Sequence, residues 1–540
     1  MTFSHGLAAL LPLACLHGPL PLHRADVAPP RPRLVLVITV DQLRPDYFDR
    51  WKHQLTGGLL RLYTEGAVFT EAYQDHAVTE TAPGHATILS GLWPAHNGIR
   101  LNAEGVQDST APLLVVTNGP GASPHRFRGT TLFDWIKAVD PRARALSVSR
   151  KDRGAILPLG RAREQVYWYQ SGLFTTSRYY ADSLPSWVRE FNARGLPFQA
   201  AGRAWTLLLP DTAYHEVDDE PWENLGRVAV FPHRFPVDTA RAAGAISGSP
   251  VIDSLTLLFA VEGLETLRLG RRGGGTDVLA VSLSATDAVG HAFGPDSREI
   301  HDQILRLDRY LGWFFERVFD RVGRDNVVIV LTADHGVTPM PERTRAKTGA
   351  AAYRVSVDTL IAAVNRDLDR LAGGATAAEP REWLIFDSGM LMLRDNGRFA
   401  ALGIRTDSVI DVVASRMRAV PGMGRVARPA DLARADTATD AVARRWLHHL
   451  APEARVMLVA SPQPGSVWGV ENFPIAMHGL PTEDDAHVPI IFWGRGVRRG
   501  TYAGRMNTVD IAPTLGALLG VTPLSLIDGR ARVDALLPRD

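Results

Sequence analysis

LVLVITVD, at residues 34–41, gives the clearest indication of the architecture of this chain. Its apolar and β-branched residues run on without the alternation of a half-exposed strand, which indicates a strand buried on both faces of a parallel sheet. Asp41 follows at the carboxyl end of this strand. In open α/β sheets ligands gather at that end, because the loops that leave the strands line a crevice there.

Three later apolar runs lie beside candidate metal ligands in the same way. They are residues 278–283 before Asp287 and His291, residues 327–331 before Asp334 and His335, and residues 488–493 after His478 and His487. Apolar residues at helical spacing from Ile300 to Val318 predict the long crossover helix that parallel strands need. The predicted fold is an α/β three-layer sandwich around a mostly parallel central sheet, with insertions forming a cap.

The composition indicates a large globular protein with almost no net charge, and therefore without a strong overall electrostatic field. Of the 540 residues, 45% are hydrophobic and 22% are charged, which is enough to bury a large core. The 59 basic residues nearly balance the 58 acidic ones, so an anionic substrate must be held by local charges. We therefore predict small-molecule substrates and no nucleic-acid partner.

The N-terminal stretch is typical of a secretory leader. The apolar run from Leu7 to Leu22 is short, broken by prolines and followed by further prolines, which favours a signal peptide over a membrane span. We predict a signal peptide and leader over residues 1–29, a periplasmic or secreted location, and no transmembrane span in the mature chain. Cys15, the single cysteine, is where a lipid anchor would attach. The rest of the chain can bind metals only through histidines and oxygen ligands.

Residues 30–540 are predicted to form one catalytic domain. Irregular sequence rich in Trp, Tyr and Pro, at about residues 131–254, predicts insertions that wall the mouth of the active site. A segment at about residues 340–455 predicts a small α+β subdomain with a helix near Asp358 to Leu371. Its Ala- and Arg-rich part, from Arg428 to Arg445, is expected to be a solvent-exposed helical face.

TETAPGHAT, at residues 79–87, combines hydroxyl side chains with the start of a helix. Pro83 suits a first helical turn, which tolerates a missing N–H group, and Gly91 ends the short apolar run that follows. Free N–H groups and the helix dipole attract anions, so a phosphate or sulfate would meet Thr81 there. Because a threonine hydroxyl is a poor nucleophile, it needs a base or a metal ion.

The candidate metal ligands are carboxylates and imidazoles without any thiolate. They are Asp41, Asp287, His291, Asp334, His335 and His478, with His487 as a rival for the last position. Such donors suit Zn²⁺ in a hydrolytic role, and two sets that each contain a carboxylate and a histidine suit a pair of ions. Two ions about 4 Å apart can activate an attacking hydroxyl and hold a departing oxygen, which is the chemistry of phosphoryl transfer.

Together these motifs resemble the alkaline phosphatase superfamily, and most closely its phosphate-irrepressible members with a threonine nucleophile. TAPGH at residues 81–85 matches the T-x-P-x-H setting of that nucleophile, which makes Thr79 the weaker candidate. D-x-x-x-H matches residues 287–291, D-H-G matches residues 334–336, and a late H-G matches residues 478–479. The resemblance implies two zinc ions, one held by Asp287, His291 and His478, and the other by Asp41, Asp334, His335 and the Thr81 oxygen.

The same resemblance assigns three substrate-binding residues. Asn102 matches an asparagine that donates hydrogen bonds to a phosphoryl oxygen, and Lys151 and Arg153 match the K-x-R segment of the monoesterase branch. The charges suit this role, because a monoester dianion carries charged oxygens that a lysine and a forked arginine stabilise. The segment from Phe174 to Tyr180 also resembles the family, without an assigned chemistry.

The predicted function is a two-zinc alkaline phosphatase that hydrolyses phosphate monoesters through a phosphothreonine intermediate on Thr81. A nucleotide pyrophosphatase or phosphodiesterase of the same superfamily stays open, because it would share the metal ligands and Asn102. A sulfatase or a phosphoglycerate mutase fits less well, because those enzymes do not use threonine as the nucleophile. The last alternative is a metal-containing binding module that has lost turnover.

Overall fold

The computed structural model describes residues 1–2, 31–103, 105–115, 119–227, 230–372, 382–394, 396–451, 453–470 and 473–538. Cys15 and nearly all of the predicted signal peptide lie outside these residues, so both predictions stay open. The fold and the site below belong to one compact unit, residues 31–537.

A nine-stranded sheet forms the centre of this unit. Across the sheet the order is β18 (Gly500–Tyr502), β2 (Ala67–Phe69), β17 (Ile490–Gly494), β10 (Val327–Thr332), β1 (Leu34–Val40), β9 (Asp277–Leu283), β4 (Ala145–Ser149), β5 (Gln165–Gln170) and β6 (Leu173–Thr175). The adjacent strands β10, β1, β9, β4 and β5 run parallel, whereas β17 and β6 are antiparallel to their neighbours. The mostly parallel sheet is therefore confirmed.

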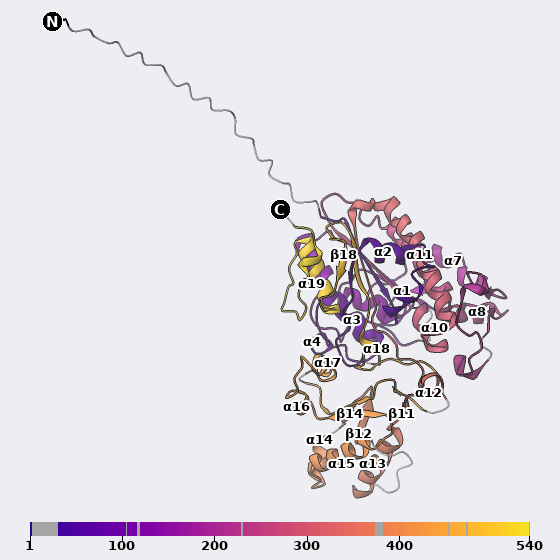
Figure 1. Cartoon of the computed structure of the whole chain (residues 1–540), viewed down its shortest axis with the longest axis vertical. Helices are drawn as coiled ribbons and strands as arrows, with labels where there is room; N and C mark the ends of the chain where they lie inside the picture. The colour runs from indigo at the N-terminus through magenta and orange to yellow at the C-terminus, as the bar shows by residue number, and fades with distance from the viewer. Residues whose placement is uncertain are drawn as a thin grey trace. The chain divides into compact units, whose positions relative to one another are not determined.

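Helices cover both faces of this sheet. Successive side chains of a strand point to opposite faces, so a strand that is apolar throughout packs against helices on each side. Leu34, Leu36 and Ile38 of β1 pack into one core, and Val35 and Val37 pack into the other. The first core contains α1 (Asp46–Trp51), α2 (Gly58–Glu65), α9 (Val251–Thr266) and α11 (Arg298–Val322), and the second contains α3 (Thr81–Ser90), α5 (Leu132–Val139) and α19 (Ile511–Leu519). Every residue of β1 is buried, and Figure 1 shows α11 and α2 apart from α19. The predicted three-layer sandwich is confirmed.

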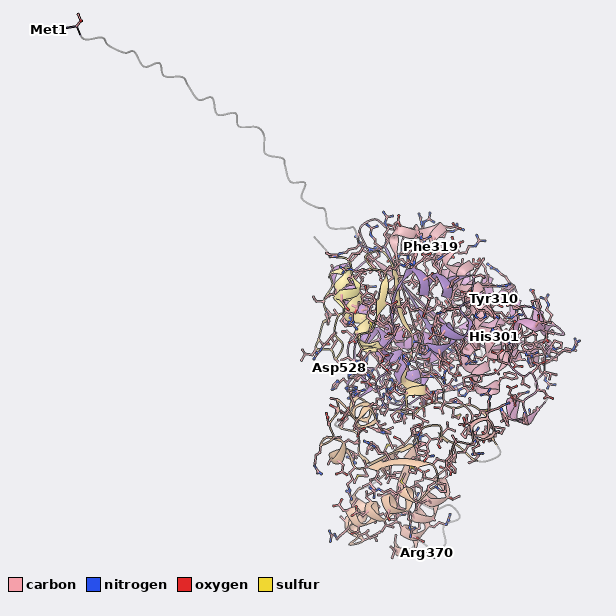
Figure 2. The ribbon with its side chains drawn as sticks, viewed as in Figure 1. Met1, His301, Tyr310, Phe319, Arg370 and Asp528 are labelled. Atoms are coloured by element: carbon pink, nitrogen blue, oxygen red, sulfur yellow. The ribbon has the colours of Figure 1, made fainter. Side chains whose placement is uncertain are left out.

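The long helix α11 is the predicted crossover between β9 and β10. The hydroxyl of Ser297 accepts a hydrogen bond from the N–H of Ile300 at 3.1 Å and so caps the helix start. Figure 2 labels His301, Tyr310 and Phe319 along the helix. His301 is buried and stacks on Trp51 of α1 with ring centroids 4.5 Å apart, which ties the two helices together.

The structure differs from the prediction over residues 131–254. β4, β5 and β6 come from this range and belong to the central sheet, so its first part is not an insertion. The sequence of β4 is ALSVS, and β5 contains Tyr and Trp. Neither strand has the continuous aliphatic sequence of the other central strands, which is why the prediction missed them. The outer limits of the predicted domains remain a prediction.

A second, four-stranded antiparallel sheet follows α12 (Pro341–Thr348). Its order is β12 (Leu384–Asp387), β13 (Met390–Leu393), β15 (Val456–Pro462) and β14 (Met423–Ala427). The helices α13 (Asp358–Leu371) and α15 (Thr406–Arg418) pack on it around a core of their own. α13 occupies the range predicted for a helix.

The expectation of a solvent-exposed helical face from Arg428 to Arg445 is wrong at its end. This range holds α16 (Pro429–Leu432) and the start of α17 (Ala441–His449). Arg445 is buried, with Nε 3.2 Å from a carboxylate oxygen of Asp75 and Nη2 2.6 Å from Glu483. The buried carboxylate of Asp75 and the exposed one of Glu483 offset the desolvation of this guanidinium, and a local charge pattern cannot reveal partners from elsewhere in the chain.

Among the described helices, none is by itself long and apolar enough to cross a bilayer. One bent pair, Thr239–Gly248 with Val251–Thr266, reaches the required length and composition together.

Candidate active site

Thr81 is the first residue of α3 and is almost fully buried. Glu80 precedes it in extended conformation, and Gly91 ends the helix in the left-handed region with φ of 69°. A Cβ atom on Gly84 would lie 2.1 Å from the carbonyl oxygen of Asp334. Only glycine therefore allows the helix start to approach the loop that follows β10.

The predicted ligands converge at the carboxyl ends of neighbouring parallel strands. Asp41 follows β1, Asp334 and His335 follow β10, and Asp287 and His291 lie on α10 (Ala285–Phe293), which follows β9. Ligand atoms of Asp287, His291 and His478 lie within 4.8 Å of one another, and so do those of Asp41, Asp287 and His335. Asp334 adjoins the second group, with Oδ2 3.7 Å from His335 Nε2. Asp287 is common to both groups.

All three histidines are oriented by backbone carbonyl groups. The Nδ1 atoms of His291, His335 and His478 lie 2.6, 2.9 and 2.8 Å from the carbonyl oxygens of Ala476, Gly336 and Thr79. A carbonyl can only accept, so each Nδ1 carries a proton, and each Nε2 presents its lone pair whenever the ring is neutral. This is the orientation that second-shell partners give to metal-binding histidines.

The buried donor atoms fit a pair of metal ions. Asp41 and His335 have no exposed surface. Within the described part of the chain, neither Asp41 Oδ1 nor His335 Nε2, which lie 3.4 Å apart, has a hydrogen-bond partner, whereas Asp41 Oδ2 contacts the ammonium of Lys151. Unpaired buried carboxylate oxygens are costly, and cations offset that cost. Oxygen and imidazole donors without thiolate suit Zn²⁺ among other divalent ions.

Lys151 supplies a positive charge between the two groups. Its Nζ lies 2.5 Å from Asp41 Oδ2, 2.7 Å from Asp287 Oδ2 and 3.1 Å from the Thr81 hydroxyl. Burial works to raise the pKa of Asp287, but Lys151 and then His291 outweigh it and hold that pKa well below its ordinary value. Burial also opposes ionisation of Asp334, whose pKa is nevertheless lowered by the imidazoles of His335 and His85.

Asn102 and Glu80 brace the start of α3. Asn102 Oδ1 accepts a hydrogen bond from the N–H of Ala82 at 2.8 Å, and its own N–H donates to Glu80 Oε2 at 2.7 Å. Glu80 Oε1 accepts from the hydroxyl of Ser388, in the turn between β12 and β13, at 3.0 Å. A chain of hydrogen bonds therefore links the second sheet to both neighbours of Thr81.

Two buried residues of the site have no role in the sequence prediction. The side chain of Gln42 donates to Asp287 Oδ1 at 3.1 Å, and its N–H donates to Asp334 Oδ1 at 3.2 Å. His85 lies 3.1 Å from Asp334 Oδ2 through Nδ1 and 2.8 Å from the Ser282 hydroxyl through Nε2. His85 is part of the T-x-P-x-H motif, whereas only its position after Asp41 could have drawn attention to Gln42.

The two weaker candidates lie outside the cluster. His487 Nε2 contacts the carbonyl oxygen of Thr70 at 2.9 Å, and its ring stacks on Tyr73. The hydroxyl of Thr79 donates to the carbonyl oxygen of Leu480 at 2.9 Å. The structure therefore groups His478, and not His487, with Asp287 and His291.

A cavity of about 580 Å³ opens onto this centre. Its lining from the predicted site comprises Thr81, Asn102, Lys151, Arg153, Asp287, His291 and His478. Trp168, Gln170, Gly244 and Ser247 are also among its lining residues. Arg153 stands on α6 (Asp152–Ile156), one turn beyond β4. The predicted phosphoryl-binding side chains thus share one cavity with the threonine and one of the two ligand groups.

Known proteins match nearly the whole chain. It is 32% identical to alkaline phosphatase PhoV of Synechococcus elongatus, over 94% of this chain and 93% of that protein. It is 34% identical to alkaline phosphatase PhoK of a Sphingomonas species, over 94% and 91%. The crystal structure of wild-type alkaline phosphatase PafA superimposes with a TM-score of 0.85 at 28% identity, over 94% and 99%. A PafA mutant with a threonine, an asparagine, a lysine and an arginine replaced matches similarly, with a TM-score of 0.84 at 27% identity over the same shares.

Residues 35–352 match the Type I phosphodiesterase / nucleotide pyrophosphatase family. This match, together with the alkaline phosphatases that align over nearly the whole chain, shows that the chain belongs to that family and is an enzyme of the alkaline phosphatase superfamily.

Proposed function

We propose that this protein is a two-zinc alkaline phosphatase that hydrolyses phosphate monoesters through a phosphothreonine intermediate on Thr81. The observation that carries the proposal is the Thr81 hydroxyl at the start of α3, in a cavity beside two groups of oriented metal donors. The alkaline phosphatase relatives support the reaction class.

Asp287, His291 and His478 would hold one zinc ion, and Asp41, Asp334, His335 and the Thr81 oxygen the other. Such ions lower the pKa of a hydroxyl group and stabilise charge on a departing oxygen. Gln42 and His85 hold the carboxylates of Asp287 and Asp334 in place, as partners of metal ligands do.

The chain's own residues would position the substrate for attack. Thr81 Oγ forms a bond to phosphorus while the bond to the alcohol oxygen breaks, and water then cleaves the phosphothreonine. The positive end of the α3 dipole lies at Thr81 and would favour the negative charge of the transferring group, whereas the N–H of Ala82 is held by Asn102. Asn102, Lys151 and Arg153 bind the phosphoryl oxygens. The residue types Thr, Asn, Lys and Arg replaced in the PafA mutant are those of Thr81, Asn102, Lys151 and Arg153, which supports this assignment.

Monoester substrates are favoured over diesters because of charge. A monoester dianion keeps charged oxygens through a loose transition state, and Lys151 and Arg153 place two cations in the cavity. A diester offers less charge to these groups. The diesterase alternative would need apolar contacts in their place.

The test is hydrolysis of an aryl phosphate beside its methyl diester, with wild-type protein and Thr81→Ala. Wild type should prefer the monoester, and Thr81→Ala should lose turnover while its zinc content stays unchanged. A preference for the diester would overturn the assignment in favour of a phosphodiesterase. Zinc-loaded wild type without activity on either ester would favour the binding-module alternative. A periplasmic or secreted location remains a proposal that rests on the N-terminal leader.

A further inference from the structure

Arg150 lines the active-site cavity, yet nothing in the proposed mechanism uses it. It follows β4 directly and is half-buried. Within the described part of the chain, Arg150 has no hydrogen bond or ion pair. The other cations of the cavity are engaged, because Lys151 contacts Asp41 and Asp287, and Arg153 Nη1 lies 3.6 Å from Asp152. A guanidinium without a partner in a ligand cavity is available to bind an anion.

The cavity is larger than the phosphoryl group requires. Its volume of about 580 Å³ lies within the range of pockets that hold whole small molecules. Apart from the predicted site residues, the lining includes the polar residues Gln170, Ser171 and Ser247. Trp168 and Tyr169 also border the cavity but are at most 5% exposed, so their rings offer little apolar surface to a substrate. Polar side chains and the guanidinium of Arg150 are therefore available to contact the alcohol part of the substrate.

We propose that this outer part of the cavity is a subsite for a second anionic group, carboxylate or phosphate, on the alcohol part of the substrate, with Arg150 as its charge partner. The inference rests on the proposed phosphatase function and adds a substrate class to it. Phosphate monoesters of anionic alcohols would be preferred over monoesters of neutral alcohols of the same size. Gln170 and Ser247 would supply hydrogen bonds beside the guanidinium.

Three substrates separate the possibilities. Glycerol 3-phosphate has a neutral alcohol part, 3-phosphoglycerate carries a carboxylate at the same position, and 1,3-propanediol bisphosphate carries a second phosphate. Arg150→Gln should lower kcat/KM about tenfold or more for the two anionic substrates, as expected for loss of one charge-assisted hydrogen bond. It should change glycerol 3-phosphate less than threefold. Arg150→Lys should retain part of the preference, because the charge remains.

A matched control removes the same charge from the surface. Arg142 precedes β4, and its side chain is 76% exposed, so Arg142→Gln should leave all three substrates unchanged. An equal loss on all three substrates with Arg150→Gln would overturn the subsite and assign Arg150 to the transferring phosphoryl group. No loss on any substrate would also overturn it.

Binding measurements keep this test separate from that of the proposed function. Should wild type turn over none of the substrates, the proposed function fails, but calorimetry can still compare binding of 3-phosphoglycerate and glycerol 3-phosphate. Tighter binding of 3-phosphoglycerate to wild type, lost in Arg150→Gln, would support the subsite. Equal binding of the two compounds would overturn it.

Discussion

Buried carboxyl groups occur in two regions of the molecule with opposite surroundings. In the active site, Asp287 and Asp334 are at most 5% exposed, and nearby cations overcome the effect of burial and lower the pKa of both groups. Glu223 and Glu299 are at most 2% exposed. Burial and neighbouring acidic groups raise the pKa of Glu223 to about 9 and that of Glu299 to about 8.

The groups that face the second pair explain this difference. Glu223 faces Glu299, Glu220 and Asp218, with Arg343 as the opposing cation. Glu299 faces Asp218 and Asp302, with Arg298 as the opposing cation. His233 Nε2 lies 2.8 Å from Glu299 Oε1. The active-site carboxyls are therefore built to stay charged and to bind cations, whereas the pair of Glu223 and Glu299 is built to hold protons.

The largest expected effect is loss of the cation from the charged region. Asp41→Asn should lower kcat/KM for an aryl phosphate by about a thousandfold, because loss of several kcal/mol of metal stabilisation corresponds to that factor. Bound zinc, measured by mass spectrometry, should fall with it. Dialysis of wild type against a chelator should have the same effect, and added zinc should reverse it. Asp182→Asn, at a 99% exposed carboxylate, is the control. An Asp41→Asn enzyme with full zinc and full activity would contradict the assignment.

Lys151 gives the next effect. Lys151→Ala removes a charge that contacts Asp41, Asp287 and Thr81, so monoester turnover should fall roughly 10- to 150-fold, the range for hydrogen bonds to charged groups. Methyl diester turnover should fall less. Lys137→Ala serves as the control, because Lys137 pairs with Glu164 away from the cavity. Equal losses on both esters would show that Lys151 does not select monoesters.

The pKa of Glu80 is subject to both influences. Burial raises it, and hydrogen bonds from Asn102 and Ser388 oppose that rise. As a positioning residue it should act through Asn102. Glu80→Ala should lower kcat about tenfold with little change in KM, and Glu80→Gln should restore most of it, because an amide can still bond to both partners. Ser388→Ala should cost less than Glu80→Ala. A glutamine variant as impaired as the alanine variant would contradict this role.

The last effect is on stability and not on activity, and it depends on pH. The pKa of Glu223 rises from 4.5 in the unfolded chain to about 9 in the folded protein, so the unfolded state loses this proton first. Stability from this group is therefore present below about pH 4.5 and is lost as the pH rises towards 9. Glu223→Gln should stabilise the protein relative to wild type increasingly from pH 5 to pH 9, by up to about 1.4 kcal/mol per pH unit. Denaturant unfolding at several pH values measures this difference. A constant difference at all pH values would contradict a raised pKa.

The sequence predicts those parts of the fold that are determined by neighbouring residues, such as the central strand and single helices. β1 is almost uniformly apolar and fully buried, and α13 covers Asp358–Leu371, the range predicted for a helix. The motifs that follow β1, β9 and β10 converge because parallel strands end at one edge of the sheet. The convergence of these carboxylates and imidazoles is therefore predictable from three short motifs and one late histidine, whereas their role as metal ligands stays a prediction.

Long-range contacts leave no such pattern. Arg445 is buried because Asp75, more than three hundred positions away, meets it. Gln42 bridges Asp287 and Asp334, and an isolated glutamine carries no sign of that. The raised pKa of Glu223 likewise depends on acidic residues that only the fold brings together. Each of these features comes from pairing between distant segments.

The shared position of Asp287 makes the two halves of the centre interdependent. Its carboxylate belongs to both groups of donor atoms, and Gln42 and Lys151 also hold it. Metal binding in one half would therefore change the position and the charge of a side chain that borders the other, so the two occupancies would be coupled. A metal titration of wild type would then depart from the curve of two independent sites, and a variant of Asp287 would disturb both halves together.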